Sequence, residues 1–125
     1  MRDNQDVGRH GEKEAAAFLE HNGYRIIARN YKTRLGEIDI VASDQDTICF
    51  VEVKTRLSEK FGSPLEAVSV FKQRQIAKAA LLYLKEHKLL ERRARFDVVS
   101  VKFISDTPKI DLIRNAFELS QHFSY

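Results

Sequence analysis

Three charged side chains, Asp39, Glu52 and Lys54, interrupt two otherwise apolar runs at residues 36–42 and 47–54. Carboxylates beside an ammonium are groups that can hold a hard divalent cation and stabilise developing negative charge. An unpaired charge in a buried strand is strongly unfavourable, so each of these residues needs a partner or a chemical function. The sequence therefore contains the components of a metal site, provided that the chain brings them together.

The two runs that carry these charges are typical of a β-hairpin, because both are rich in Val and Ile and a polar segment separates them. If Asp44 pairs with Thr47 across a two-residue turn, Asp39 lies directly opposite Glu52. Lys54 shares a strand face with Glu52, because side chains alternate along a strand. This register predicts that the three charged groups converge.

Two opposed carboxylates destabilise a sheet unless something offsets their repulsion. Mg²⁺ or Mn²⁺ would do so, with Asp39, Glu52 and the Val53 carbonyl as ligands, since these ions bind carboxylate and carbonyl oxygens. A second interpretation is a half-exposed sheet face on which Lys54 neutralises Glu52 and water solvates Asp39. The strand pattern alone leaves both interpretations open.

The rest of the chain alternates between helical and extended patterns. The predicted elements are a helix over 7–22, strands over 24–31, 36–42 and 47–54, a short helix from Ser63, a helix over 71–90, and strands over 95–101 and 109–113. This order predicts an α/β fold in which helices flank a mixed β-sheet. We expect one domain over residues 1–125, with a flexible tail from about residue 118.

The periodicity of the two longer helices predicts which of their side chains face the sheet. Glu12 falls on the packing stripe of the first helix, and Gly23 stands just past the end of that helix. Glu12 would then point toward the hairpin as a further ligand for metal or water, or would only favour the positive helix N-terminus. The buried stripe predicted for the longer helix consists of Ile76, Ala79, Ala80, Tyr83 and Leu84.

Several stretches of the sequence resemble a known family. The resemblance is carried mainly by Gly8-Arg9-His10-Gly11-Glu12, Gly36-Glu37-Ile38-Asp39 and Phe50-Val51-Glu52-Val53-Lys54-Thr55-Arg56. These segments are similar to the uncharacterised bacterial YraN family, which is related to archaeal Holliday-junction resolvases. The spacing of Asp39, Glu52 and Lys54 also resembles the signature of the PD-(D/E)xK nuclease superfamily, although Ile38 stands where that signature has proline.

The resemblance implies a restriction-endonuclease-like fold and a metal-dependent endonuclease that hydrolyses DNA phosphodiester bonds, in branched or junction DNA. It implies catalytic roles for Asp39, Glu52, Lys54 and Glu12, because the related resolvases have a glutamate on their first helix. The alternative is a nucleic-acid-binding protein that keeps the nuclease fold without turnover. Symmetric cutting of a junction needs two sites, which a homodimer would supply.

Basic residues are concentrated in one part of the chain. Residues 72–95 contain eight Lys and Arg against two Glu, whereas the preceding 71 residues contain ten basic and twelve acidic side chains. This asymmetry favours a polyanionic partner, because Lys and Arg supply the sequence-independent part of nucleic-acid affinity. A solvated helix face is the other interpretation. The residues that we expect at the nucleic acid are Arg34, Arg56, Lys72, Gln73, Arg74 and Lys78.

Composition excludes several other classes of protein. No apolar run approaches the roughly 20 residues of a membrane-spanning helix, and the polar start does not resemble a secretory signal. The single cysteine, Cys49, cannot form an internal disulfide and is expected in the core. We therefore expect a cytoplasmic protein without membrane association. Asp97, the other carboxylate within a predicted strand, has no ligand partner by spacing, which favours a structural role.

Overall fold

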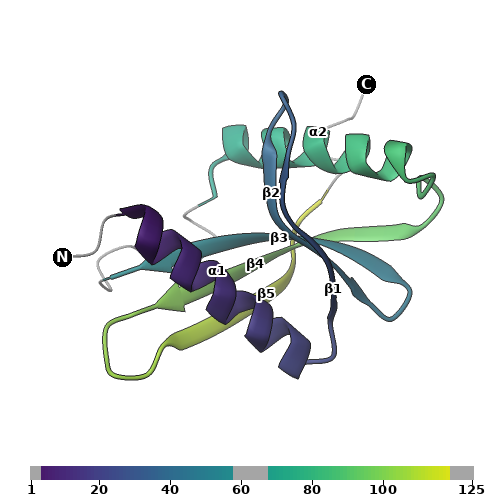
Figure 1. Ribbon diagram of the computed structural model, residues 1–125. Helices are drawn as coiled ribbons and strands as arrows, with labels where there is room; N and C mark the ends of the chain where they lie inside the picture. Colours follow the sequence, from purple (N-terminus) through teal and green to yellow (C-terminus); the bar gives the residue numbers. More distant parts are fainter. Residues whose placement is uncertain (1–3, 58–67, 119–125) are drawn as a thin grey trace.

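The chain forms a five-stranded mixed β-sheet with one helix on each face (Figure 1). The computed structural model describes residues 4–57 and 68–118. The elements are α1 (Asn4–His21), β1 (Arg25–Lys32), β2 (Glu37–Asp44), β3 (Thr47–Arg56), α2 (Val70–Glu86), β4 (Arg93–Lys102) and β5 (Lys109–Phe117). The predicted α/β class with a mixed sheet is confirmed. Across the described ranges, no helix is long and apolar enough to cross a membrane.

The strands lie in the sheet in chain order, from β1 to β5. Neighbouring strands are antiparallel except β3 and β4, which are parallel from the Thr47–Arg93 pair to the Arg56–Lys102 pair. This arrangement places β3 in the middle of the sheet, with a partner strand on either side. The two charges predicted on β3 therefore lie in the interior of the sheet rather than at its edge.

Each face of the sheet packs against one helix, and alternate residues of β3 contribute to the two layers. Phe50 belongs to the layer beneath α2, together with Ile76 and Tyr83. Val51 belongs to the layer beneath α1, together with Leu19. This alternation follows from the strand period of two, and it places Glu52, like Phe50, on the α2 face. The five residues predicted as the buried stripe of α2 are all buried.

Helix α1 approaches the central strand very closely at one point. Gly11 is buried there, and a Cβ atom at this position would collide with the Thr55 side chain on β3. At Gly8, one turn earlier, an added Cβ atom would have no neighbouring side chain or strand within 4 Å. The helix ends at His21, one residue before the predicted end, and Gly23 lies just past it with a φ of 89°, in the left-handed region that glycine adopts without strain.

Helix α2 ends at Glu86, four residues before the predicted end at 90, so this predicted boundary is wrong. The Leu89 N–H donates to the Leu84 carbonyl at 2.7 Å, and the Lys88 N–H donates to the Lys85 carbonyl. These bonds form a Schellman motif, in which the residue just past the helix takes a left-handed conformation. Lys88, with φ of 57°, occupies the place where glycine is usual, so the sequence carries no stop signal there.

Strand β5 extends to Phe117, four residues beyond the predicted end at 113. The Phe117 ring stacks on Phe96 of β4 with centroids 4.6 Å apart, so burial of these two rings continues the strand. Asn115, with φ of 52°, lies where the pairing of β4 with β5 shifts register. The short helix predicted from Ser63 lies outside the described residues, and so does the tail predicted from about residue 118, apart from Glu118 itself.

Candidate functional site

The hairpin of β2 and β3 has the predicted register. Asp44 pairs with Thr47, and the two-residue turn contains Gln45 in a left-handed conformation with φ of 56°. The backbone ladder then runs from this pair to the pair formed by Ile40 and Val51, where it ends. The next two residues in the same register are Asp39 and Glu52, the predicted acidic pair. They therefore lie immediately beyond the last backbone pair, where the two strands separate.

Asp39 and Glu52 therefore face each other beyond the last backbone pair. The Asp39 carboxylate accepts a hydrogen bond from the Val53 N–H at 2.8 Å, in place of a backbone acceptor on β2. The carboxyl groups of Asp39 and Glu52 lie close enough together for each to affect the pKa of the other. The two carboxyl groups predicted from the strand pattern are thus brought together in the structure.

Burial strongly affects the protonation of this pair. Only 5% of the Glu52 side chain is exposed, and this burial, followed by the nearby Asp39 charge, raises the pKa of Glu52 to about 8. Burial also raises the pKa of Asp39, although the Val53 N–H and the nearby lysines favour its charged form. Burial and the proximity of the two carboxyl groups therefore both oppose the state in which both groups are charged.

Two ammonium groups accompany the carboxyl pair. Lys54, half-buried on the same strand as Glu52, favours the charged forms of both carboxyl groups. Lys72 reaches the site from the first turn of α2, and its Nζ lies 3.8 Å from Glu52 Oε1. From the sequence, Lys72 is predicted only to contact phosphate. Nothing in the chain indicates on which face of the sheet α2 packs. The observed position makes Lys72 a member of the carboxylate site.

Glu12 lies near this pair without joining it. Burial raises its pKa, and the Asp39 charge is the next largest contribution, with Arg29 opposing both. Within the parts of the chain that the structure describes, no three Asp, Glu, His or Cys side chains are close enough to hold one metal ion. A metal ion at this pair would therefore have two acidic ligands, and the role of Glu12 as a further ligand stays a prediction.

Two carboxylates suit Mg²⁺, which usually binds one or two in proteins and completes its shell with water and substrate phosphate. The Val53 N–H points toward Asp39, and in a strand the carbonyl of a residue points to the same side as its N–H. This carbonyl therefore faces the region where β2 and β3 have separated. Ser100, paired with Lys54 across β3 and β4, adds a buried hydroxyl that has no hydrogen-bond partner among the described residues. The donor set thus fits a hydrated hard cation.

Apart from Lys72, which contacts Glu52, the residues predicted to bind nucleic acid fall into two groups. Arg34, Arg74 and Lys78 are exposed, the first in the turn between β1 and β2 and the others on α2. Arg56 is only 8% exposed, and the Gln73 side-chain amide donates to the Val68 carbonyl at 3.0 Å next to the α2 N-cap, Ser69. The first group has the free surface that a phosphate contact requires.

Asp97 has the structural role that was predicted, and its network joins distant parts of the chain. It is fully buried and accepts hydrogen bonds from the Tyr24 hydroxyl at 2.8 Å, from Arg95 Nε at 3.1 Å and from the Asn115 N–H at 2.9 Å. Arg95 also donates to Asp44 at 2.8 Å. Arg95, one of the eight basic residues within residues 72–95, therefore belongs to this network and does not contribute to a surface for nucleic acid.

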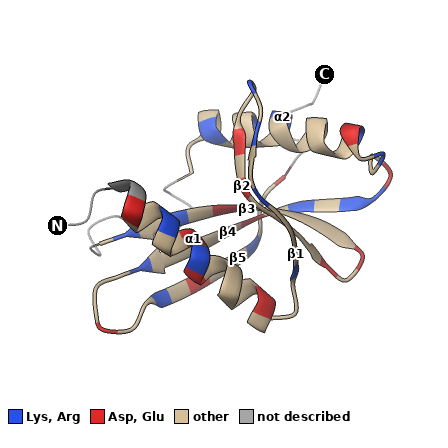
Figure 2. Ribbon diagram, viewed as in Figure 1, with Lys and Arg blue, Asp and Glu red and all other residues tan. Residues whose placement is uncertain are grey.

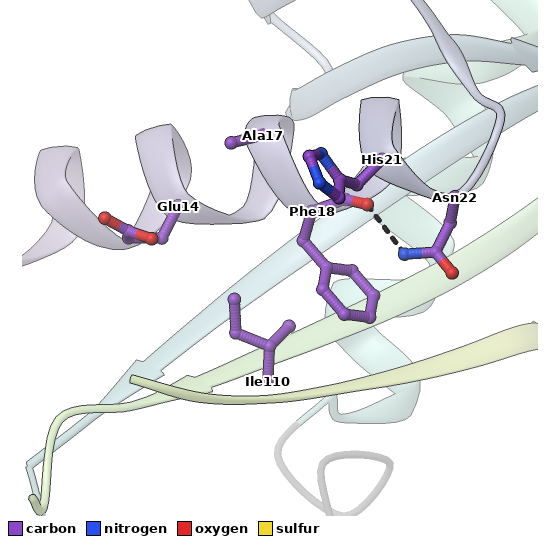
Figure 3. A pocket seen from close by; sticks show the side chains of 6 residues that line it. All are labelled: Glu14, Ala17, Phe18, His21, Asn22 and Ile110. Atoms are coloured by element: carbon purple, nitrogen blue, oxygen red, sulfur yellow. Dashed lines mark hydrogen bonds between the residues drawn. The ribbon is translucent and has the colours of Figure 1, made fainter. Parts of the chain in front are cut away.

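A hollow of about 400 Å³ lies elsewhere, between α1 and β5 (Figure 3). Its lining consists of Glu14, Ala17, Phe18, His21, Asn22 and Ile110. The Asn22 side-chain amide donates to the Phe18 carbonyl at its rim. None of the predicted site residues lines this hollow, so the carboxyl pair is the better candidate for chemistry.

Comparisons with known proteins give a consistent family and no established activity. The model of a family described as "Uncharacterised protein family UPF0102" matches residues 11–101. A UPF0102 protein of Geobacter metallireducens is 52% identical over 117 residues, covering 94% of this chain and 96% of that protein. A UPF0102 protein of Syntrophus aciditrophicus is 51% identical over 120 residues, covering 96% and 94%.

A more distant relative, a UPF0102 protein of Clostridium kluyveri, is 42% identical over 118 residues, covering 93% of this chain and 97% of that protein. Among solved structures, SfsA of Pyrococcus furiosus in complex with Ca²⁺ is similar with a TM-score of 0.39 at 16% identity. That match covers 90% of this chain but only 62% of the SfsA chain.

Proposed function

We propose that this chain, which belongs to the uncharacterised protein family UPF0102, is a metal-dependent endonuclease that hydrolyses phosphodiester bonds in DNA. UPF0102 is the YraN family, so the family predicted from the sequence is confirmed. One observation carries the proposal: Asp39 and Glu52 meet on the α2 face, beside Lys54 and Lys72. Two buried carboxyl groups that face each other are costly to a fold, which favours a chemical role for them.

In this proposal Asp39, Glu52 and the Val53 carbonyl hold Mg²⁺ or Mn²⁺. When bound, such an ion polarises the scissile phosphate and lowers the pKa of a coordinated water. Lys54 and Lys72 stabilise the extra negative charge that the phosphate oxygens gain in the transition state. Glu12 of α1, whose pKa the Asp39 charge raises, would position the attacking water.

The substrate reaches the site along exposed cations. Arg34 lies in the turn between β1 and β2, and Arg74 and Lys78 lie on α2. The phosphates of a DNA strand would contact these cations as the strand passes over the carboxyl pair. Figure 2 shows basic residues at the start of α2 and at the tip of the β1–β2 hairpin. Branched or junction DNA is the substrate implied by the resemblance to the resolvases.

A second candidate is a nucleic-acid-binding protein without turnover. The pKa of about 8 for Glu52 favours it, because a carboxyl group that keeps its proton at neutral pH binds a cation weakly. Both candidates use the exposed cations Arg34, Arg74 and Lys78 to bind nucleic acid. They differ only in whether the carboxyl pair binds a metal ion.

The proposal is tested by cleavage of labelled DNA with Mg²⁺ or Mn²⁺, using single strands, duplexes, flaps and four-way junctions. The wild-type protein is compared with Asp39→Asn and Glu52→Gln, and with Glu20→Gln on the exposed face of α1 as the matched control. We expect cleavage by the wild type and by the control, and none by the two site variants. Absence of cleavage on every substrate overturns the nuclease proposal, and salt-dependent binding without cleavage selects the second candidate.

A further inference from the structure

An aromatic ring stands exposed beside the candidate site. Phe71, in the first turn of α2, is 70% exposed, and the next residue, Lys72, reaches Glu52. A large apolar side chain loses favourable burial when water surrounds it. Exposed apolar side chains that cluster within a polar rim are typical of an interaction surface.

Phe71 lies on a stripe of cations. Phe71, Arg74 and Lys78 are spaced i, i+3 and i+7, so they share the exposed face of α2. Ile76 and Ala79 on the opposite side pack on the sheet. The outer face of α2 therefore combines one aromatic ring with two positive charges.

The turn between β1 and β2 extends this surface. A Cβ atom at Gly36 would lie only 2.7 Å from the Gln75 carbonyl oxygen, so the turn rests directly on α2 one helical turn after Phe71. The hairpin tip accordingly stands beside α2 in Figure 1. The same turn carries Arg34, which is exposed, and Leu35, which is 43% exposed.

We propose that this surface, defined as the stacking surface of Arg34, Leu35, Phe71, Arg74 and Lys78, binds an unpaired stretch of a nucleic-acid strand. The Phe71 ring stacks on an unpaired base, and the cations contact the flanking phosphates. Bases inside a duplex already stack on their neighbours and present no free face to the ring. The inference deepens the proposed function, because it selects substrates that have unpaired nucleotides beside the cleaved phosphate.

Charge complementarity favours nucleic acid over a protein partner. Three of the five residues are Arg or Lys, and none is acidic. An apolar protein interface is usually depleted in charge at its centre, whereas a groove for single strands combines cations with aromatic rings. The stacking surface has the second composition.

The experiment measures binding without cleavage. The full chain, in EDTA at low salt, is titrated into a short DNA single strand that contains 2-aminopurine, and into a blunt duplex of the same length. Phe71→Ala removes the ring and Phe71→Tyr retains one. Leu90→Ala, an exposed apolar residue beyond the other end of α2, is the matched control. Circular dichroism checks that all variants are folded.

We expect the wild type to prefer the single strand and to quench 2-aminopurine on binding. Phe71→Ala should weaken single-strand binding by about 5- to 100-fold and abolish the quenching, because one stacked base contributes about that factor. Phe71→Tyr and Leu90→Ala should behave as the wild type. Duplex binding should change little in any variant.

Three results overturn the inference: equal single-strand binding by Phe71→Ala and the wild type, equal weakening on single strand and duplex, or no binding of any oligonucleotide. The last result would assign the surface to a protein partner. Failure of the nuclease proposal is distinguishable, because Phe71-dependent binding without cleavage leaves this inference standing. Cleavage that does not depend on Phe71 supports only the nuclease.

Discussion

The Val53 N–H donates a hydrogen bond to the Asp39 carboxylate at 2.8 Å, across the point where backbone pairing between β2 and β3 stops. One side-chain oxygen thus replaces the carbonyl that a regular ladder would supply. Asp39 consequently contributes both to the sheet and to the candidate site. A substitution at this position must be chosen so that the two contributions are separated.

The substitutions Asp39→Asn and Asp39→Ala separate the contribution of Asp39 to the sheet from its contribution to the candidate site. Asparagine keeps an oxygen that accepts the Val53 N–H, whereas alanine leaves this buried donor unpaired. We expect Asp39→Ala to be less stable than Asp39→Asn by about 1–3 kcal/mol, and both to lack metal-dependent cleavage. Urea unfolding at neutral pH measures the difference in stability. Equal stability of the two variants would show that the hydrogen bond contributes nothing to the fold.

The pKa of Glu52 predicts an unusual pH dependence of stability. Its folded value of about 8 lies above the ordinary value of 4.5, so between these values the folded state binds the proton more tightly than the unfolded state. Without divalent cations, stability should therefore fall as the pH rises from about 5 to about 8, because unfolding then releases a proton. Thermal denaturation in EDTA across this range measures the slope.

Glu52→Gln cannot titrate, so this variant should lose most of the slope and should exceed the wild type in stability above pH 8. Added Mg²⁺ should stabilise the wild type progressively more as the pH rises, because only the deprotonated pair binds it. The same slope in Glu52→Gln as in the wild type would refute the raised pKa.

Lys72 should set the pH at which the site accepts a cation. Its Nζ lies 3.8 Å from Glu52 Oε1 and favours the charged carboxylate. Replacement by methionine should raise the pKa of Glu52 further, so Mg²⁺-dependent stabilisation should begin at a higher pH than in the wild type. Lys78→Met, an exposed change on the same helix, is the matched control. Identical shifts in the two variants would show that only net charge matters.

Sequence patterns were sufficient where the determining signals are local. The hairpin register follows from the two-residue turn, and Gly23 marks the end of α1. The predicted end of α2 is wrong because Lys88 adopts a conformation in which glycine is usual. The predicted end of β5 is wrong because Phe117 is buried against a ring from another strand. The position of Lys72 beside Glu52 also depends on long-range packing. No pattern within the chain encodes such contacts.

Two glycines of α1 should respond oppositely to alanine. Gly11→Ala would place a methyl group against Thr55, which should cost about 1–3 kcal/mol of stability. Gly8→Ala meets nothing and should stabilise the helix by about 0.5–1 kcal/mol. Adding Thr55→Ala to Gly11→Ala should recover part of the loss, since it removes the Oγ1 and Cγ2 atoms and leaves only the Cβ of residue 55 in the way. Thermal denaturation of the three variants checks these values, and a destabilising Gly8→Ala would contradict the packing.

The burial of Cys49 gives the protein a built-in reporter of its own opening. This sulfur is completely enclosed in the layer beneath α1, and its enclosure raises the pKa of the thiol to about 12. A thiolate is the species that alkylating reagents attack, so the native chain offers them almost nothing. Because the chain contains a single cysteine, each labelling event would record a moment when the central strands had parted. The labelling rate, measured with and without a cation or nucleic acid, would then show how the ligand changes the frequency with which the sheet opens.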